Sequence, residues 1–235
     1  MSEPGRYAKQ TCCIVPVKSQ ERAKSRLAPL LSSNERRMLS SAMLTDVLNR
    51  LKAVSGIDYI KVLTRDRIAS DIASRMGVDL LPDGPKSDLN QALTRAAVQL
   101  EEEKMGTMVI VPADVPGLEP DELDRVLDRH NLEAGISLVP DRRGGGTNLL
   151  VASPPTALPF RFGRNSFRAH RHLAAGSNLT CNVALLPGIG LDLDLAHDLE
   201  KYLATGPDGE TAALLRCWDI SSRLEAIEPQ GGTRP

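Results

Sequence analysis

The sequence predicts one α/β domain built on a mixed, mostly parallel β-sheet with helices on both faces. In the first half, short apolar runs rich in β-branched residues alternate with segments of helical periodicity. This alternation is typical of a parallel sheet whose two faces are both covered. In the second half, a polar glycine-rich segment separates two apolar runs, which indicates a hairpin or an excursion from the sheet.

Local signals place the individual elements. Ser32 and Glu35 form a capping-box pattern before the first helix, Gly77 closes the second, Asp88 caps the third and Pro120 opens the fourth. Strands are expected at residues 12–17, 59–64, 78–81, 107–111, 134–140, 149–152 and 180–186. Helices are expected at residues 32–51, 66–76, 88–104, 121–130, 166–175, 196–204 and 210–223, and a turn at residues 83–86.

Length and composition narrow the class of protein. A chain of 235 residues suits one domain, expected at residues 12–224 between an N-terminal tail (1–11) and a C-terminal tail (225–235). A net charge of −1 and 3% aromatic residues weigh against a nucleic-acid-binding protein. No signal segment opens the chain, and no apolar run approaches the roughly 18 residues of a membrane span. Four cysteines without metal-site spacing fit a reducing compartment, so we expect a cytoplasmic protein.

A loop rich in positive charge follows the first expected strand. It holds Lys18, Arg22, Lys24 and Arg26. In α/β sheets, ligands bind beyond the carboxyl ends of the strands, so this loop indicates a small, strongly anionic ligand such as a nucleoside triphosphate. The alternative is a solvated loop, because Glu21 lies within the same run.

This loop lacks the glycines of the common phosphate-binding motifs. No glycine lies between Val17 and Leu27, and the P-loop pattern occurs nowhere in the chain. A phosphate site here would therefore depend on basic side chains. Lys18, Lys24 and Arg26 could neutralise the charge that builds up on a leaving pyrophosphate.

Three aspartates are candidate metal ligands. Asp114 follows the most apolar expected strand, at the edge where ligands bind. If the later segment is extended, Asp192 and Asp194 face the same side, where they repel each other unless a cation lies between them. Three carboxylates would suit Mg²⁺, a hard cation that prefers oxygen ligands. The alternatives are a turn aspartate and an exposed strand edge.

Two glycine-containing loops are candidate anion sites. Residues 144–148 could present backbone N–H groups and a hydroxyl to a phosphate or carboxylate. Residues 162–166 lead into a helix that starts at Ser166, and a helix N-terminus favours an anion. The alternatives are a flexible hairpin tip and an ordinary N-cap at Ser166. His170 and His172 are two residues apart on this helix, and we expect both at the surface.

Five segments together resemble the phospholactate guanylyltransferases of coenzyme F-420 biosynthesis. The similarity covers about residues 14–203 in the same order, and the set is specific although no single member is. The segments are Ile-Val-Pro-Val-Lys (14–18) with Ala-Lys-Ser-Arg-Leu (23–27), Asp-Leu-Asn-Gln-Ala-Leu (88–93), Val-Pro-Ala-Asp-Val-Pro (111–116), Gly-Gly-Thr-Asn (145–148) and Phe-Gly-Arg-Asn-Ser-Phe (162–167).

The resemblance implies a fold like that of the nucleotide-diphospho-sugar transferases and a specific reaction. The phosphate of a three-carbon phospho-acid attacks the α-phosphorus of GTP, and Mg²⁺-pyrophosphate leaves. The acid is 2-phospholactate, phosphoenolpyruvate or 3-phosphoglycerate, and the residues do not decide which. By resemblance, the GTP phosphates are bound by Lys18, Lys24 and Arg26, and the nucleoside by Asp88 and Asn90. The acid is bound by Thr147, Gly163 and Ser166, and the metal by Asp114, Asp192 and Asp194.

Two other functions compete with this interpretation. Another nucleotidyltransferase of the same fold, acting on a sugar phosphate or transferring a cytidylyl group, would typically carry a glycine-rich loop after the first strand. A non-catalytic nucleotide-binding module would bind GTP without releasing pyrophosphate. No motif sets an oligomeric state, and a homodimer is kept as a working assumption.

Overall fold

Seven strands form one sheet in the computed structural model, which describes residues 10–18, 24–83, 88–130 and 132–227. The strand order is β3-β2-β1-β4-β6-β5-β7. β6 is antiparallel to β4 and β5, and the other neighbouring pairs are parallel. The expected mixed, mostly parallel sheet is therefore confirmed. The strands are β1 (Thr11–Val17), β2 (Tyr59–Thr64), β3 (Asp79–Pro82), β4 (Thr107–Ile110), β5 (Gly135–Pro140), β6 (Thr147–Ser153) and β7 (Thr180–Val183).

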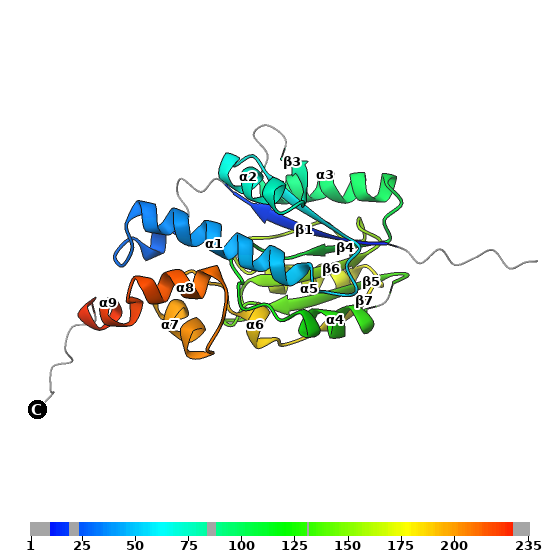
Figure 1. Cartoon of the computed structure of the whole chain (residues 1–235). Coiled ribbons are helices and arrows are strands. Elements are labelled where there is room, and N and C mark those ends of the chain that lie inside the picture. Colours follow the sequence, from blue (N-terminus) through cyan, green and yellow to red (C-terminus); the bar gives the residue numbers. More distant parts are fainter. Residues whose placement is uncertain (1–9, 19–23, 84–87, 131, 228–235) are drawn as a thin grey trace, which may run out of the picture.

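Helices cover both faces of this sheet (Figure 1). They are α1 (Ser33–Leu51), α2 (Arg67–Arg75), α3 (Leu89–Glu102), α4 (Pro120–Asp128), α5 (Ser166–Gly176), α6 (Pro187–Gly190), α7 (Ala196–Ala204), α8 (Glu210–Cys217) and α9 (Ile220–Ile227), with a short 3-10 turn η2 (Ser25–Leu27). None of the described helices is long and apolar enough to cross a membrane. Arg22, residues 84–86 of the expected turn and most of both expected tails lie outside the described residues.

The interior strand β1 contributes to both apolar layers because successive side chains of a strand point to opposite faces. Cys13 and Val15 of β1 are buried in the layer under α1, α2 and α4. Cys12 and Ile14 are buried in the layer under α3 and α5. This double burial explains why the strand reads as a continuous apolar run.

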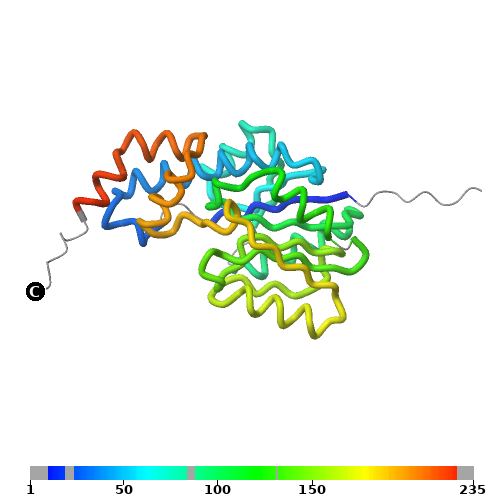
Figure 2. The backbone as a smooth tube through the Cα atoms, turned by 90° about the horizontal axis from the view of Figure 1, so that it is seen from below, coloured from blue at the N-terminus to red at the C-terminus, as the bar shows by residue number. Residues whose placement is uncertain are grey.

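A third apolar cluster lies beyond the sheet, between α1 and the C-terminal helices. Leu39 and Met43 of α1 are buried there against residues of α7 and α8, among them Leu199, Tyr202 and Leu215. Figure 2 shows α7 and α8 beside α1, although these helices are far from α1 in the sequence. The extended segment that joins the sheet to these helices carries two of the candidate metal ligands.

The helix-start signals are confirmed. The Ser32 hydroxyl accepts a hydrogen bond from the Glu35 backbone N–H, and the Glu35 carboxylate accepts one from the Ser32 backbone N–H. Asp66 and Asp88 cap α2 and α3 through their side chains. Such caps depend on a few adjacent residues, so the local sequence determines them.

Several boundaries differ from the expectation. The expected helix at 210–223 is two helices, α8 and α9, because Asp219 between them adopts φ 48°, outside the helical region. The short helix α6 was not expected. β6 begins at Thr147, so part of the expected glycine-rich loop is strand. β1 begins at Thr11 and α9 extends to Ile227, inside the expected tails.

Candidate active site

The candidate residues lie at the edge of the sheet where the parallel strands end. Lys18 follows β1 and Asp114 follows β4. Because β6 runs in the opposite direction, its first residues, Thr147 and Asn148, lie at this same edge. The sheet topology thus brings together residues from three separate parts of the chain.

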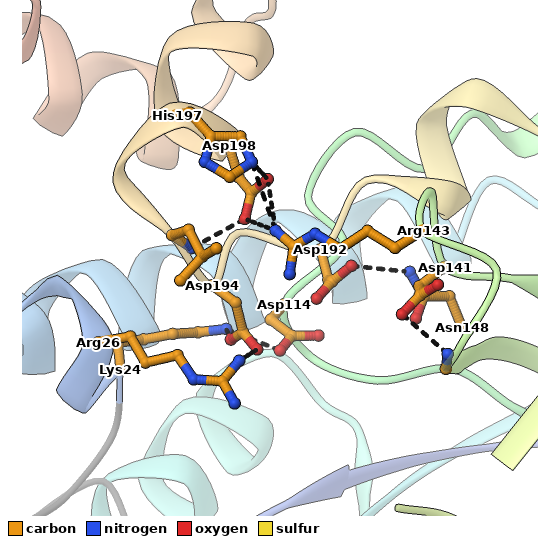
Figure 3. A network of polar contacts seen from close by, with 12 residues as sticks. Lys24, Arg26, Asp114, Asp141, Arg143, Asn148, Asp192, Asp194, His197 and Asp198 are labelled. Carbon is orange, nitrogen blue, oxygen red and sulfur yellow. Dashed lines mark hydrogen bonds and ion pairs between the residues drawn. The ribbon is translucent and has the colours of Figure 1, made fainter. Parts of the chain in front are cut away.

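Lys24 is a buried cation held by two carboxylates (Figure 3). Its Nζ donates to Asp114 and to Asp194, each at 2.7 Å, and its side chain is only 8% exposed. Burial alone would lower the pKa of Lys24, but the two carboxylates outweigh it and hold the pKa above its usual value. Burial likewise opposes ionisation of Asp194, yet the Lys24 charge keeps its pKa below the usual value. Lys24 is therefore not part of a merely solvated loop.

Arg26 also pairs with Asp194, from the solvent-exposed side. Its guanidinium lies 3.7 Å from the second Asp194 carboxylate oxygen, and its side chain is 66% exposed. A long, exposed ion pair contributes little to stability. Arg26 is thus able to leave Asp194 for a ligand at low cost.

Asp192 lies beside Asp114 and Asp194, and its surroundings disfavour the ionised form of its carboxylate. Burial raises its pKa, and the negative charge of Asp114 raises it further. The Asn148 side-chain amide lies 3.4 Å from its carboxylate. Leu191 and Leu193 on either side are buried, so the alternation expected for residues 191–194 is present. The backbone N–H of Leu193 also donates to the Asp114 carbonyl, which ties the two segments together.

The three aspartates provide suitable ligands for Mg²⁺, but they do not form a ready-made metal site. In the part of the chain that the structure describes, no group of three or more His, Cys, Asp or Glu side chains is placed to hold a metal. The Lys24 ammonium takes the position between Asp114 and Asp194. Carboxylate oxygens suit Mg²⁺. Burial is the main cause of the raised pKa of Asp192, and the neighbouring charge of Asp114 adds to it. The metal stays a prediction.

The glycine-rich loop of residues 141–146 is held by its own aspartate. The Asp141 carboxylate accepts hydrogen bonds from the Gly145 and Gly146 backbone N–H groups, both at 2.8 Å. The expectation that these groups are available to an anion is wrong, because a carboxylate within the loop already occupies them.

Two arginines of this loop, Arg142 and Arg143, hold the segment that carries Asp192 and Asp194. The Arg142 backbone N–H donates to the Gly190 carbonyl at 2.7 Å. The Arg143 guanidinium pairs with the buried Asp198 at 3.1 Å, at the start of α7 (Figure 3). Sequence reasoning missed this pair, because its partners are far apart in the chain and separated by two strands.

The residues predicted for the acid lie around the start of α5. Ser166 is buried at the first position of this helix, and Asn165, with φ 58°, is the N-cap, so the alternative of Ser166 as an ordinary N-cap is wrong. Gly163 adopts φ 131°, a conformation that side chains disfavour.

His170, expected at the surface, is fully buried. Its Nδ1 lies 3.1 Å from the Thr147 hydroxyl, and its Nε2 accepts from the Arg161 backbone N–H.

Asn90 connects the residues predicted to bind the nucleotide to the start of α5. Its side-chain amide accepts from the Phe162 backbone N–H at 2.7 Å and donates to the Phe162 carbonyl at 3.1 Å. The predicted nucleoside-binding residue thus anchors the loop that precedes α5. The two predicted binding regions are joined by this side chain.

Lys18 and Asp88 line a cavity of about 670 Å³ at the ends of β1, β2 and β3. The Asp88 carboxylate also caps α3 by accepting from the Gln91 backbone N–H. Three further cations of this cavity were not identified from the sequence. They are Arg37, Arg65 and Arg67. Two of them, Arg65 and Arg67, come within three residues of the end of the expected strand at 59–64, so the rule used for Lys18 could have found them.

The family model described as "Guanylyl transferase CofC like" matches residues 11–229. The chain belongs to this family. Membership makes it a nucleotidyltransferase, as the resemblance of its five segments implied.

Three curated relatives of this CofC-like chain are about one-third identical to it. The phosphoenolpyruvate guanylyltransferase of Conexibacter woesei is 36% identical, over 81% of this chain and 86% of the relative. The 3-phospho-D-glycerate guanylyltransferase of Colwellia psychrerythraea is 32% identical, over 81% of this chain and 90% of the relative. The 2-phospho-L-lactate guanylyltransferase of Methanothermobacter thermautotrophicus is 33% identical, over 88% and 90%.

Solved structures share the fold of this CofC-like chain at low sequence identity. A putative nucleotide-diphospho-sugar transferase from Desulfovibrio desulfuricans matches with a TM-score of 0.75 and 16% identity, over 92% of this chain and 97% of its own. A cytidylyltransferase from Leptospira borgpetersenii matches with a TM-score of 0.57 and 15% identity, over 96% and 99%. The expected nucleotide-diphospho-sugar transferase-like fold is confirmed.

Proposed function

We propose that this protein transfers the guanylyl group of GTP to the phosphate of a three-carbon phospho-acid and releases pyrophosphate, as a step of coenzyme F-420 biosynthesis. The observation that most supports the proposal is the buried Lys24 ammonium between Asp114 and Asp194. It places a cation and two carboxylates at the sheet edge where α/β proteins bind ligands. The relatives' names add the class of acceptor: phosphoenolpyruvate, 3-phospho-D-glycerate and 2-phospho-L-lactate.

Charge neutralisation and alignment supply the catalysis in this proposal. Lys18, Lys24 and Arg26 bind the triphosphate and stabilise the charge on the departing pyrophosphate. The acid's phosphate is already a nucleophile near neutral pH, so alignment replaces a general base. Mg²⁺, when bound by Asp114, Asp192 and Asp194, would supply further neutralisation of the phosphates.

The two substrates would meet between the cavity and the start of α5. Asp88 and Asn90 would lie near the nucleoside, while the Thr147 hydroxyl, Gly163 and Ser166 would bind the acid. The N-terminus of α5 favours a phosphate or a carboxylate. Because Asn90 holds the Phe162 backbone, nucleotide and acid would be positioned by one connected structure.

A substrate panel tests this function. Purified protein with Mg²⁺ is given GTP, CTP or ATP together with phosphoenolpyruvate, 2-phospholactate or 3-phosphoglycerate, and pyrophosphate release is measured. We expect release with GTP and at least one acid, and none when the acid or the metal is omitted. Silence with all three acids would reject guanylyl transfer, and turnover with CTP alone would favour a cytidylyltransferase. A cytoplasmic location and a dimer stay predictions.

A further inference from the structure

A buried histidine connects two parts of the predicted acid site. His170 of α5 is 0% exposed. Its Nδ1 lies 3.1 Å from the Oγ1 of Thr147, at the start of β6. Its Nε2 accepts a hydrogen bond of 2.9 Å from the Arg161 backbone N–H, and the Phe162 ring contacts it edge-on at 4.9 Å between centroids. Both nitrogens of the ring therefore have partners, and the mechanism described above uses neither.

The Arg161 contact fixes which nitrogen carries the proton. A backbone N–H can only donate, so Nε2 must offer its lone pair. Burial, together with the positive charge of Arg161, lowers the pKa of His170 to about 4, so the ring is neutral near pH 7. A neutral ring with an unprotonated Nε2 carries its proton on Nδ1. Nδ1–H then donates to the Thr147 oxygen.

This donation determines what the Thr147 hydroxyl can offer. A hydroxyl has one proton to donate and two lone pairs that accept. With its oxygen accepting from His170, the proton of Thr147 is directed to a different acceptor. Carboxylate oxygens and unprotonated phosphate oxygens accept hydrogen bonds and donate none, so they fit a hydroxyl held in this orientation.

We propose that His170 is a positioning residue that holds the Thr147 hydroxyl as a hydrogen-bond donor to the anionic group of the phospho-acid. The inference rests on the proposed function in so far as Thr147 binds that acid. His170 acts only through Thr147 and the Arg161 backbone. The same ring holds the segment that leads to Gly163 and Ser166, the other two residues predicted to bind the acid.

The tautomer can be measured on the wild-type protein without turnover. Long-range ¹H–¹⁵N correlation spectra of ¹⁵N-labelled protein at pH 7 distinguish a protonated from an unprotonated ring nitrogen. We expect Nδ1 of His170 to be protonated and Nε2 unprotonated. A proton on Nε2, or on both nitrogens, would overturn the inference. This result is independent of whether the protein transfers guanylyl groups, so the two proposals can fail separately.

Two substitutions separate the two hydrogen bonds of the ring. In H170N the side-chain amide lies near the former Nδ1 and can still donate to Thr147, whereas in H170Q it lies near Nε2 and can still accept from Arg161. We expect H170Q to raise the KM for the acid about tenfold or more and to leave the KM for GTP unchanged, because a hydrogen bond to an anion is weakened. H170N should keep a lower KM for the acid than H170Q. The control H172Q changes an exposed histidine of the same helix and should behave as wild type.

A double-mutant cycle shows whether the effect passes through Thr147. T147V removes the hydroxyl and keeps the shape of the side chain. If His170 acts by orienting that hydroxyl, H170Q should cause no further rise in the KM for the acid in the T147V background. An equal rise in both backgrounds would overturn the inference. If H170Q fails to fold, as judged by circular dichroism, the tautomer measurement decides.

Discussion

Lys24 combines an unfavourable backbone with favourable charge contacts. Its φ of 51° lies in the left-handed region, which costs a residue with a Cβ about 1–2 kcal/mol. The conformation is compatible with the Nζ contacts to Asp114 and Asp194, which remove an otherwise unpaired buried charge. Two carboxylates from distant parts of the chain thus stabilise a local conformation that the sequence around Lys24 would not favour.

The substitution Asp114→Asn tests the role of this carboxylate. Asparagine keeps the shape but loses the charge that faces Lys24 and that would bind a metal. We expect pyrophosphate release to fall to the limit of detection, while circular dichroism and the thermal midpoint show a folded protein. Asp128→Asn changes an exposed aspartate at the far end of α4 and should retain full activity. Full turnover by Asp114→Asn would show that the carboxylate is not required.

At the scale of elements, α8 is capped by a side chain from another helix. The Asp46 carboxylate of α1 is buried and accepts from the Glu210 and Thr211 backbone N–H groups at 2.9 and 2.8 Å. Gly209 precedes α8 with φ 102°, and a Cβ there would lie 2.6 Å from the Asp46 Oδ1. The cap therefore needs both an aspartate on α1 and a glycine before α8.

Replacing Asp46 by alanine should weaken the attachment of the C-terminal helices. Two buried N–H groups would lose their acceptor, so we expect the free energy of unfolding to fall by about 1–3 kcal/mol. Urea denaturation at pH 7 measures the change. Asp208→Ala, which removes a 93% exposed partner of Arg50 in the same region, should cost less than about 1 kcal/mol. Equal losses in the two variants would contradict the capping role of Asp46.

These examples show which features of the fold and site are visible in the sequence. The caps at Ser32, Asp66 and Asp88 involve adjacent residues, so local patterns predicted them. The strands followed from their apolar runs. Asp46 and His170 have partners on other elements, and no local pattern indicates such contacts. Residue patterns indicated the basic loop, the three aspartates and the two glycine-containing loops, and the resemblance added Asp88, Asn90 and the expected roles. Neither carried information on Asp141, which occupies two N–H groups of the glycine-rich loop.

On the scale of the whole molecule, two histidines are buried in a neutral state on different elements. His130 follows α4, and its ring contacts the hydroxyls of Ser137 and Ser153. Burial lowers the pKa of His130 to about 4, as it does for His170. Both rings are exposed to solvent when the chain unfolds. As the pH falls, the two histidines therefore become protonated in the unfolded protein at a higher pH than in the folded protein.

Acid should therefore destabilise the protein at mild pH. Each histidine has an ordinary pKa of 6.5, and its folded pKa is lower, so its contribution to stability is present above pH 6.5 and is lost as pH falls toward about 4. The loss should be about 1.4 kcal/mol per pH unit for each histidine in this range. Urea denaturation at several pH values measures the slope.

The substitution His130→Gln isolates one of the two contributions. Glutamine stays neutral, so the slope between pH 6.5 and 4 should become shallower by about the share of one histidine. His172→Gln, at an exposed position, serves as the control for the histidine-to-glutamine change itself. An unchanged slope in His130→Gln would show that this ring does not resist protonation in the folded state.

The order of the chain has a consequence for how the protein is made. All seven strands end by Val183, whereas Asp192 and Asp194 come later in the sequence. During synthesis, the ribosome therefore completes the residues of the sheet, including Lys24, before it adds either of these carboxylates. A message truncated after Gly190 would encode the seven described strands and both Lys24 and Asp114, but not Asp194, so such a product would contain the scaffold of the site and only one of the two carboxylates that hold the lysine.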